Sequence, residues 1–375
     1  MLENECEDPL DLLKRFVEIE SFSHDLDGIV AMAKELEKVF SPYASEMNHL
    51  ITEDGTSHLK MTFGEGTRQI LLLTHLDTVH PKTTLKRMPW KVENGLAFGP
   101  GVLDIKASYV IIYKMLKYVQ SDFPNDDWKI VWLNTGDEEI GSPSAKEFVI
   151  EEAKKSEAVL VLEPALSNGA LKTARKAVGN YTITVRGRSA HAGVNPEDGI
   201  NAINGIAKLV ELIANQQNLK EGTTVTVGTI AGGTLINVVP NLATAEVDIR
   251  VRTIKEKERI ETFFKALKPV SDGVTLEVSG GIARPLFLRT EGTAWLYSIA
   301  EQCAAKLNIK LEEAETGGGS DGNFAATTGV PVLDGLGAIG GGAHSPGEYV
   351  KIESIEERAI LLGEIIKEIA KKLEQ

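Results

Sequence analysis

Three short apolar runs, each followed by acidic or histidine residues, limit the folds that this chain can adopt. The apolar runs are residues 70–73, 130–133 and 159–162. The polar residues that follow them are His75 and Asp77, then Asp137, Glu138 and Glu139, then Glu163. Such runs are typical of buried parallel strands, and open α/β sheets bind ligands outside the carboxyl ends of these strands. The sequence therefore predicts a functional site at one edge of an α/β sheet.

The order of helix and strand patterns predicts two domains. A chain of 375 residues can bury more than one hydrophobic core. Helix and strand patterns alternate at first, and residues 181–278 then follow the strand, helix, strand, strand, helix, strand order of a ferredoxin-like module. We expect an α/β fold in which a mixed sheet sandwiched by helices occupies residues 1–177 and 290–375. The ferredoxin-like βαββαβ domain is expected as an insertion at residues 178–289.

Charge and composition exclude some classes of partner. The net charge is −14 and the basic residues are scattered, whereas a nucleic-acid-binding surface needs clustered lysine and arginine. No apolar run approaches the roughly 18 residues of a membrane span, and the amino terminus carries acids where a secretory signal carries bases. Two distant cysteines, Cys6 and Cys303, fit a reducing compartment, and neither resembles a nucleophile. We expect a cytoplasmic protein with no nucleic-acid or membrane partner.

Each candidate site residue has a functional and an ordinary interpretation. His75 and Asp77 at a strand end can both point into one site, one as a metal ligand and one as its hydrogen-bonded support. Asp104 lies in the segment 99–106, where glycines allow a close approach to a ligand, although a helix cap is an equally open interpretation. The acids at 137–139 resemble a solvated turn, but their place after a buried strand favours roles as base and ligand.

Two further residues complete the candidate set. Glu163 ends a buried strand, where a carboxylate is costly unless it is paired or metal-bound. His344 lies in the glycine-rich loop at 340–346. Together the two imidazoles and three carboxylates form a mixed nitrogen and oxygen ligand set that suits two zinc-like ions, with cobalt or manganese as alternatives. A glutamate that binds neither ion would then transfer the proton during the reaction.

Four segments resemble a known enzyme family. They are residues 74–79, 99–106, 136–142 and 187–193. Their sequences are similar to those of the co-catalytic zinc aminoacylases and carboxypeptidases, a family that includes glutamate carboxypeptidase, acetylornithine deacetylase, succinyl-diaminopimelate desuccinylase and peptidase T. The resemblance runs in order from about residue 10 to the carboxyl terminus. Segments 317–324 and 333–337 look closest to the glutamate carboxypeptidase-like branch.

The resemblance implies a role for each candidate ligand. It pairs His75 with Glu163 on one zinc ion and Glu139 with His344 on the other, and it places Asp104 as the bridge between them. Asp77 would then orient His75 from behind. Glu138 would be the general base that activates the attacking water and protonates the leaving amine. His80 is not a ligand position in the family, and we expect it to be solvent-facing or structural.

The inserted domain acquires its roles in the same way. In the family this domain is a lid that also dimerises, and its histidine, here His191, reaches the catalytic site across the dimer to stabilise the oxyanion. Asn237 and Arg284 match lid positions that hold the substrate carboxylate, for which an arginine fork is well suited. Gly319 and Ser320 lie in a glycine-rich loop that resembles the family's loop beside the substrate. A homodimer through the lid is therefore expected.

The implied substrate is a small peptide or an N-acyl amino acid. The implied reaction is hydrolysis of an amide bond next to a substrate carboxylate by a metal-bound hydroxide. The branch resemblance favours a carboxypeptidase that releases a carboxyl-terminal amino acid such as glutamate. An N-acyl amino acid deacylase and a di- or tripeptidase of the same family are the alternatives.

Two other classes of protein remain open. Residues 318–322 fit the G-x-S-x-G nucleophile elbow around Ser320, and Asp334 and His344 follow in the order of a serine hydrolase triad. These three residues lie within a short span, however, and this interpretation leaves the other acidic and histidine clusters unexplained. A non-catalytic binding protein on a hydrolase fold is the third interpretation. It ranks lower because all five predicted ligands and the base are present.

Overall fold

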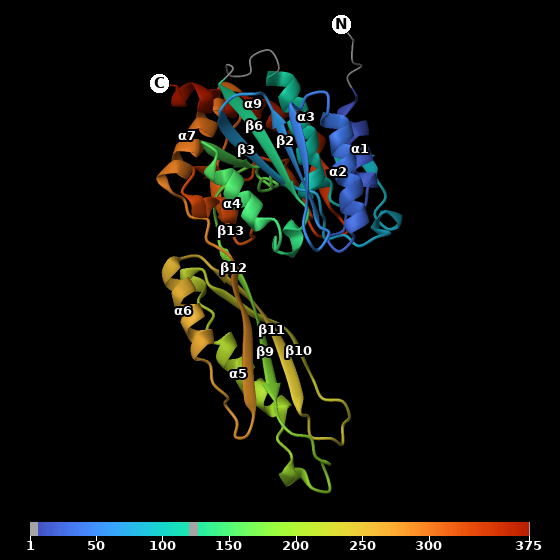
Figure 1. The fold of residues 1–375 in the computed structure, drawn as a ribbon, viewed down its shortest axis with the longest axis vertical. Helices are drawn as coiled ribbons and strands as arrows, with labels where there is room; N and C mark the ends of the chain where they lie inside the picture. The colour runs from blue at the N-terminus through green and yellow to red at the C-terminus, as the bar shows by residue number, and fades with distance from the viewer. Residues whose placement is uncertain (1–6, 120–126, 375) are drawn as a thin grey trace. The chain divides into compact units, whose positions relative to one another are not determined.

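The structure, a computed structural model, describes residues 7–119 and 127–374, so Cys6 lies outside the described residues. The chain divides into two units, each with its own hydrophobic core (Figure 1). Unit 1 comprises Met1–Ala174, Leu288–Glu315 and Ser320–Gln375, and unit 2 comprises Arg175–Phe287 and Thr316–Gly319. The short segment Thr316–Gly319 joins unit 2, whereas the sequence pattern had placed it in the main domain.

Unit 1 is built on a six-stranded mixed sheet in the order β1-β2-β6-β3-β7-β14. The strands are β1 (Glu46–Ile51), β2 (Ser57–Phe63), β3 (Arg68–His75), β6 (Trp128–Thr135), β7 (Ala158–Val161) and β14 (Val332–Leu333). β3 pairs in parallel with both β6 and β7, and β14 pairs in parallel with β7. β1 and β2 add antiparallel pairs. The three apolar runs therefore form adjacent parallel strands, which confirms the predicted α/β class.

Helices flank this sheet (Figure 1). They are α1 (Pro9–Glu18), α2 (Leu26–Phe40), α3 (Ala107–Val119), α4 (Lys146–Lys154), α7 (Glu291–Lys306), α8 (Gly322–Ala325) and α9 (Ile352–Leu373). Local capping sets some of their ends: the Asp8 carboxylate accepts hydrogen bonds from the first-turn N–H groups of α1, and Thr290 caps α7 in the same way. Packing stabilises other helices: α3 is apolar around most of its surface and packs against α9.

Two small sheets complete unit 1. One has the order β15-β16-β5-β4, and the other pairs β8 with β13. Their strands are β4 (Lys91–Glu93), β5 (Leu96–Phe98), β15 (Gly340–Gly341), β16 (Tyr349–Lys351), β8 (Leu171–Arg175) and β13 (Glu313–Thr316). Single helical turns are η1 (Thr84–Lys86), η2 (Val102–Lys106), η3 (Glu138–Ile140), η4 (Pro196–Asp198), η5 (Leu219–Glu221) and η6 (Ala326–Thr328), of which η4 and η5 belong to unit 2. The strands of these small sheets are too short for apolar periodicity to predict.

Unit 2 has the predicted βαββαβ order. Its elements are β9 (Ala177–Arg186), α5 (Ala202–Ala214), β10 (Thr224–Gly232), β11 (Leu242–Val251), α6 (Ile254–Ala266) and β12 (Thr275–Arg284). The strands form an antiparallel sheet in the order β10-β11-β9-β12, and both helices cover one face of it (Figure 1). Buried and exposed residues alternate along β11, as expected for a sheet with one solvated face.

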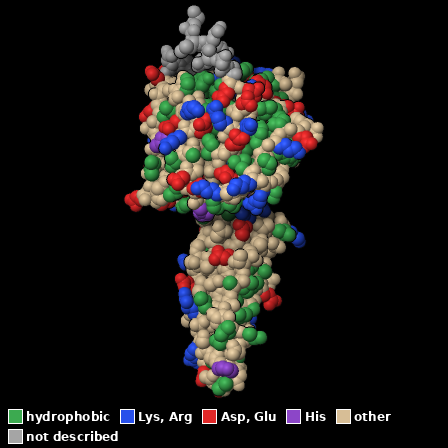
Figure 2. Space-filling view, turned by 90° about the vertical axis from the view of Figure 1, so that its right-hand side faces the viewer, with side chains coloured by type: hydrophobic (Ala, Val, Ile, Leu, Met, Phe, Trp, Pro, Cys, Tyr) green, Lys and Arg blue, Asp and Glu red, His purple; other side chains and the backbone are tan. Residues whose placement is uncertain are grey.

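The surface of unit 1 carries interspersed acidic and basic side chains on the face shown in Figure 2. Among the described residues, no helix is both long and apolar enough to cross a membrane.

The core of unit 1 contains a cluster of aromatic rings around Phe40. Its ring packs edge-on against the rings of Phe63, Tyr113 and Trp132, with centroid separations of 4.7–6.5 Å. Phe40 itself is fully buried. Edge-to-face aromatic pairs add stabilisation beyond the area they bury. This cluster joins the end of α2 to the sheet.

We predict that Phe40→Ala lowers the free energy of unfolding by about 3–5 kcal/mol, because it leaves a cavity and removes three ring contacts. Urea denaturation followed by circular dichroism measures this change. Ile51→Ala is the matched control, because Ile51 is 66% exposed at the end of β1. Equal effects of the two substitutions would contradict the packing role of Phe40.

Candidate metal centre

Parallel pairing brings the predicted ligands of the sheet to one edge. His75 is the last residue of β3 and lies opposite Thr135 at the end of β6, while Leu73 lies opposite Val161 at the end of β7. Glu138 and Glu139 follow β6 in η3, and Glu163 follows β7. The carboxyl ends of neighbouring parallel strands face the same edge of the sheet. Three polar clusters that are distant in sequence thus meet there.

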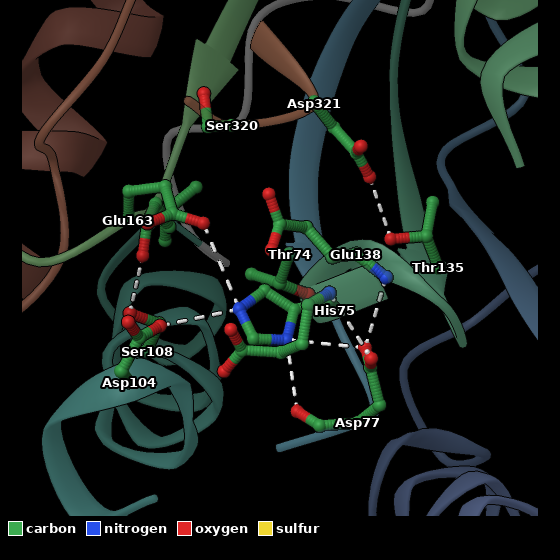
Figure 3. Close-up of polar contacts among 12 residues, drawn as sticks. Thr74, His75, Asp77, Asp104, Ser108, Thr135, Glu138, Glu163, Ser320 and Asp321 are labelled. Atoms are coloured by element: carbon green, nitrogen blue, oxygen red, sulfur yellow. Dashed lines mark hydrogen bonds and ion pairs between the residues drawn. The ribbon is translucent and has the colours of Figure 1, made fainter. Parts of the chain in front are cut away.

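His75 lies at the centre of this cluster (Figure 3). Its Nε2 atom is 3.2 Å from Asp104 Oδ1 and 3.6 Å from Glu163 Oε1. Its Nδ1 atom is 2.9 Å from the Asp77 carbonyl oxygen. Because a carbonyl only accepts hydrogen bonds, Nδ1 carries the proton in the neutral ring, and Nε2 is left with a lone pair that faces the carboxylates.

Asp104 lies between the two imidazoles. Its Oδ1 atom faces His75, and its Oδ2 atom is 3.3 Å from His344 Nε2. The same His344 nitrogen is 3.1 Å from Glu139 Oε2. The five predicted ligands therefore form two groups, His75 with Glu163 and His344 with Glu139, and each group contains one oxygen of Asp104. A carboxylate in this position can bridge two cations.

A short β-hairpin brings His344 to Asp104. β15 and β16 pair with each other, and β16 pairs with β5, which immediately precedes the Asp104 segment. His344 lies in the hairpin loop with a positive φ of 63°, a conformation that is uncommon outside glycine. The glycines of this loop were visible in the sequence, but the pairing that brings it to Asp104 was not.

The donor set fits divalent cations. Ligand atoms of His75, Asp104 and Glu139 lie within 4.8 Å of one another, and so do those of His75, Glu138 and Glu163. Glu139 Oε1 is buried without a hydrogen-bond partner among the described residues. A buried carboxylate oxygen left without a partner is costly, and a bound cation would satisfy it. Imidazole nitrogens with carboxylate oxygens are ligands that zinc and similar ions accept.

The protonation of the cluster shows how strongly it attracts positive charge. Burial opposes protonation of His75, but hydrogen bonds to Asp104 and Asp77 outweigh it and raise the pKa of His75 well above its usual value. Hydrogen bonds to Asp104 and Glu139 raise the pKa of His344 to about 11. Burial raises the pKa of Glu139 to about 7. Burial would also raise the pKa of Asp104, but hydrogen bonds from both histidines lower it.

Asp77 joins the ends of β3 and β6 from behind the cluster. Its carboxylate accepts hydrogen bonds from the backbone N–H groups of Glu138 at 3.1 Å and Glu139 at 3.2 Å. The Ser23 hydroxyl donates to the same carboxylate at 2.7 Å. Asp77 is fully buried, and its carbonyl holds the His75 ring. Asp77 therefore contacts both the His75 ring and the backbone of the two glutamates, as a positioning residue would. Ser23 was not among the predicted site residues.

Glu348 holds the backbone on which Asp104 lies. One of its carboxylate oxygens accepts hydrogen bonds from the N–H groups of Leu103 at 2.9 Å and Asp104 at 3.0 Å. The other accepts from the N–H of Gly101 at 3.0 Å and contacts His80 Nε2 at 2.7 Å. Glu348 is 1% exposed. Sequence reasoning missed this residue, although its place four residues after His344 was a signal. His80 is 9% exposed and contacts Glu348, so it is not solvent-facing.

The structure does not assemble a serine hydrolase triad. Ser320 is fully buried, and its hydroxyl donates to Asp334 at 2.7 Å and accepts from the Gly322 N–H at 3.1 Å. In Figure 3 this hydroxyl points away from His75, and His344 contacts Asp104 and Glu139 instead. The Ser320 hydroxyl therefore holds its own loop through these two hydrogen bonds.

Cys303 is buried in α7, and burial raises the pKa of its thiol to about 11. A thiol with this pKa is almost entirely protonated near neutral pH and is a poor nucleophile. This agrees with the expectation that Cys303 has no catalytic role.

The remaining predicted residues lie in unit 2, in two separate places. His191 and Asn237 are exposed and lie in neighbouring segments. His191 forms an isolated antiparallel β-bridge with Val238, and the Ala192 N–H donates to the Asn237 carbonyl at 2.9 Å. Arg284 is 6% exposed and ends β12 opposite Val178, near the start of β9. The segment with His191 follows the other end of β9.

Gly319 lies against Arg284 within unit 2. A Cβ atom at Gly319 would lie 2.6 Å from Arg284 Cδ, so a larger residue would displace the arginine. The guanidinium of Arg175 donates to the carbonyl oxygens of Gly318 at 3.1 Å and Gly319 at 2.9 Å, which holds the loop in place. Gly319 thus supports the position of Arg284.

Comparison with known proteins identifies the family. Residues 71–368 match the sequence model of peptidase family M20/M25/M40, and the chain belongs to this family. It is 31% identical to carboxypeptidase G2 of Pseudomonas sp. (strain RS-16) over 381 residues, which cover 95% of this chain and 88% of the relative. The predicted family resemblance is confirmed. The chain is therefore an M20-family metallohydrolase that acts on peptide or amide bonds.

Other relatives carry different names. The chain is 26% identical to a succinyl-diaminopimelate desuccinylase of Thioalkalivibrio sulfidiphilus, over 96% of this chain and 99% of the relative. Among solved structures, a tripeptidase from Staphylococcus aureus has a TM-score of 0.80 at 22% identity, covering 97% of this chain and 98% of that chain. An M20 metallo-carboxypeptidase from Sulfolobus solfataricus has a TM-score of 0.76 at 16% identity, covering 98% and 100%. These structural matches share the fold.

We predict that Glu348→Gln lowers the affinity for Zn²⁺ about 10–100-fold, the range found when residues that support metal ligands are replaced. The glutamine NH₂ group cannot accept the hydrogen bonds that one carboxylate oxygen accepts, so the Asp104 backbone would lose part of its support. Titration of the metal-free protein with Zn²⁺ against a competing chelator measures the affinity. Glu353→Gln, an exposed change in the same region, is the control. Equal affinities in the two variants would contradict the positioning role.

Proposed function

We propose that this chain is a two-zinc carboxypeptidase that releases a carboxyl-terminal amino acid such as glutamate. The observation that carries the proposal is the position of Asp104 between His75 and His344, with one oxygen facing each imidazole. Cobalt or manganese suits the same ligands. The relative named carboxypeptidase G2 supports the carboxypeptidase assignment. The acidic, cysteine-poor composition supports a cytoplasmic location.

Five residues would hold the two ions. His75 and Glu163 would bind one, His344 and Glu139 the other, and Asp104 would bind both. When bound, the ions supply positive charge that polarises the scissile carbonyl and lowers the pKa of the attacking water. The hydrogen bond from His75 Nδ1 to the Asp77 carbonyl keeps Nε2 directed toward Asp104.

Glu138 is the proposed general base. A carboxylate oxygen of Glu138 lies within 4.8 Å of the ligand atoms of His75 and Glu163. Its backbone is fixed by the hydrogen bond to Asp77. In the proposed reaction Glu138 takes a proton from the attacking water and then delivers it to the leaving nitrogen, so no covalent intermediate with the protein forms.

Arg284 is the proposed partner of the substrate carboxylate. Arg284 is largely buried at the end of β12, and the aliphatic part of its side chain packs against Gly319. A guanidinium can donate two parallel hydrogen bonds to a carboxylate. Asn237, which is exposed beside the His191 segment, is proposed to contact the substrate as well.

The separation of His191 from Arg284 supports a homodimer. Arg284 lies opposite Val178 near the start of β9, whereas His191 follows the far end of this 10-residue strand. A strand of this length spans about 30 Å. One lid therefore cannot present both residues to one small substrate, and we propose that His191 stabilises the oxyanion in the site of a partner chain.

The edge of the unit 2 sheet offers a surface for this dimer. β10 is an edge strand of the sheet, and an edge strand can pair with another chain. Ile203 of α5 is 37% exposed, Leu212 of α5 is 43% exposed and Ile230 of β10 is 56% exposed. Apolar side chains beside an unpaired edge are suited to burial against a second lid.

Metal analysis together with a substrate panel tests the proposal. The panel contains a carboxyl-terminal glutamyl dipeptide, an N-acetyl amino acid, N-succinyl-diaminopimelate and a tripeptide, each with and without chelator. We expect about two metal ions per chain and chelator-sensitive release of glutamate. Preference for the tripeptide or for an N-acyl substrate would move the function to the corresponding alternative branch. Metal-free, chelator-resistant activity would overturn the proposed mechanism.

We predict that Glu138→Gln retains both metal ions but loses about 10²–10⁴-fold in turnover, because a neutral amide cannot accept the proton. Steady-state kinetics and metal analysis of the same preparation measure the two properties. Glu147→Gln is the control, because Glu147 is 69% exposed on α4. Turnover close to that of the wild type would remove Glu138 from the role of base.

We predict that hybrid dimers of His191→Ala and Glu138→Gln chains regain activity. In such a dimer one site combines an intact Glu138 with the partner's intact His191. Two affinity tags allow the hybrid to be isolated, and about half of the wild-type turnover per dimer is expected because one of its two sites is complete. Hybrids no more active than either parent dimer would contradict a contribution across the dimer.

A further inference from the structure

A cavity of about 410 Å³ opens beside His344 within unit 1. The segment after β3 forms one wall, and the loop that carries His344 forms the other. Val79, Met88 and Pro346 supply apolar walls, and Arg87 also lines the space. The cavity therefore combines a predicted metal ligand, apolar surface and a cation, which is the composition of a site that binds and orients a small molecule.

Arg87 has no ion-pair or hydrogen-bond partner for its side chain within residues 7–119 and 127–374. It is exposed, and Lys86 beside it is exposed as well. Lys82 in the same segment differs, because its ammonium group is 2.8 Å from the Asp25 carboxylate. Arg87 is therefore available to an external anion, whereas Lys82 already has a carboxylate partner.

The local charge favours an anionic ligand. The chain has a net charge of −14, yet residues 79–92 contain four basic residues and no acid. Concentrated positive charge beside a cavity raises the local concentration of anions. The planar guanidinium of Arg87 fits a carboxylate through two parallel hydrogen bonds. The apolar walls would contact the methylene groups that carry this carboxylate.

We propose that this cavity binds the acyl part of the substrate and that Arg87 selects acyl groups with a free carboxylate, such as succinyl, glutaryl or glutamyl groups. The inference rests on the proposed function, in which Arg284 of unit 2 takes the carboxylate of the released amino acid. His344 lines the cavity, so a ligand bound there would lie beside one of the predicted metal ligands. Because Arg284 would bind the amino-acid part of the substrate, the acyl part needs a separate binding site.

Two matched compounds test this selectivity. N-succinyl-L-glutamate and N-butyryl-L-glutamate share the leaving amino acid and a four-carbon acyl chain, and they differ by the terminal carboxylate. Their dissociation constants are measured by calorimetry on zinc-loaded Glu138→Gln protein, with and without Arg87→Gln. Because this experiment needs no turnover, failure of the proposed reaction and failure of the selectivity remain distinguishable.

We expect Arg87→Gln to raise the dissociation constant of the succinyl compound about tenfold. This is the lower end of the effects seen when a charged hydrogen-bonded pair is lost, because Arg87 is exposed. The butyryl compound should change by less than about twofold, which also shows that the variant is folded. Arg87→Lys should raise the dissociation constant of the succinyl compound by an intermediate factor, because lysine keeps the charge but lacks the two parallel N–H donors of arginine. Lys82→Gln, with its ion pair to Asp25, should leave the ratio of the two constants unchanged.

Equal changes for the two compounds, or no change for either, would overturn the proposal. So would an effect of Arg87→Gln that follows the side-chain carboxylate of the leaving amino acid, as measured with N-butyryl-L-glutamate against N-butyryl-L-glutamine. In the otherwise wild-type enzyme the effect should appear in KM for the succinyl substrate, with kcat nearly unchanged. A fall in kcat for both substrates would place Arg87 in the catalytic machinery instead.

Discussion

The parallel pairing of β3 with β6 and β7 is the constraint on which the metal centre depends. It brings His75, Glu139 and Glu163 to one edge, and the buried carboxylate of Asp77 then ties the ends of β3 and β6 together. A carboxylate that accepts several N–H groups in a buried place fixes its donors firmly. The two glutamates after β6 are therefore held at their backbone, while their side chains remain directed into the site.

Three buried carboxylates near the predicted metal centre, Asp77, Glu348 and Glu139, differ in their hydrogen bonding. Asp77 and Glu348 are almost fully buried, and their oxygens accept hydrogen bonds from backbone N–H groups, hydroxyls or imidazole. Glu139 keeps a buried oxygen without a hydrogen-bond partner among the described residues. Asp77 and Glu348 therefore support the frame of the site, whereas a bound cation would satisfy the buried oxygen of Glu139.

The structure of unit 2 gives the dimer proposal a geometric basis. The segment that carries His191 pairs with the segment before β11, and so continues the ladder beyond β9 and away from Arg284. In the proposed dimer, a second chain would bring the residue at the opposite end of this sheet to the same substrate. In unit 1, Arg87, which has no side-chain partner among the described residues, adds a further charge to the surroundings of His344.

The sequence by itself determined the central strands, the βαββαβ order and most of the residues that meet at the predicted metal centre. Apolar runs ending in His75 or Glu163 are local patterns, because burial on both faces of a sheet dictates continuous apolar residues. Tertiary structure decided what depends on distant pairing. The two-residue strand β15 brings His344 to Asp104, and Glu348 acquires its role only by contact with a segment more than 240 residues away. The hydroxyl of Ser320 matched a nucleophile motif, and only packing revealed its burial, since burial depends on what surrounds a residue.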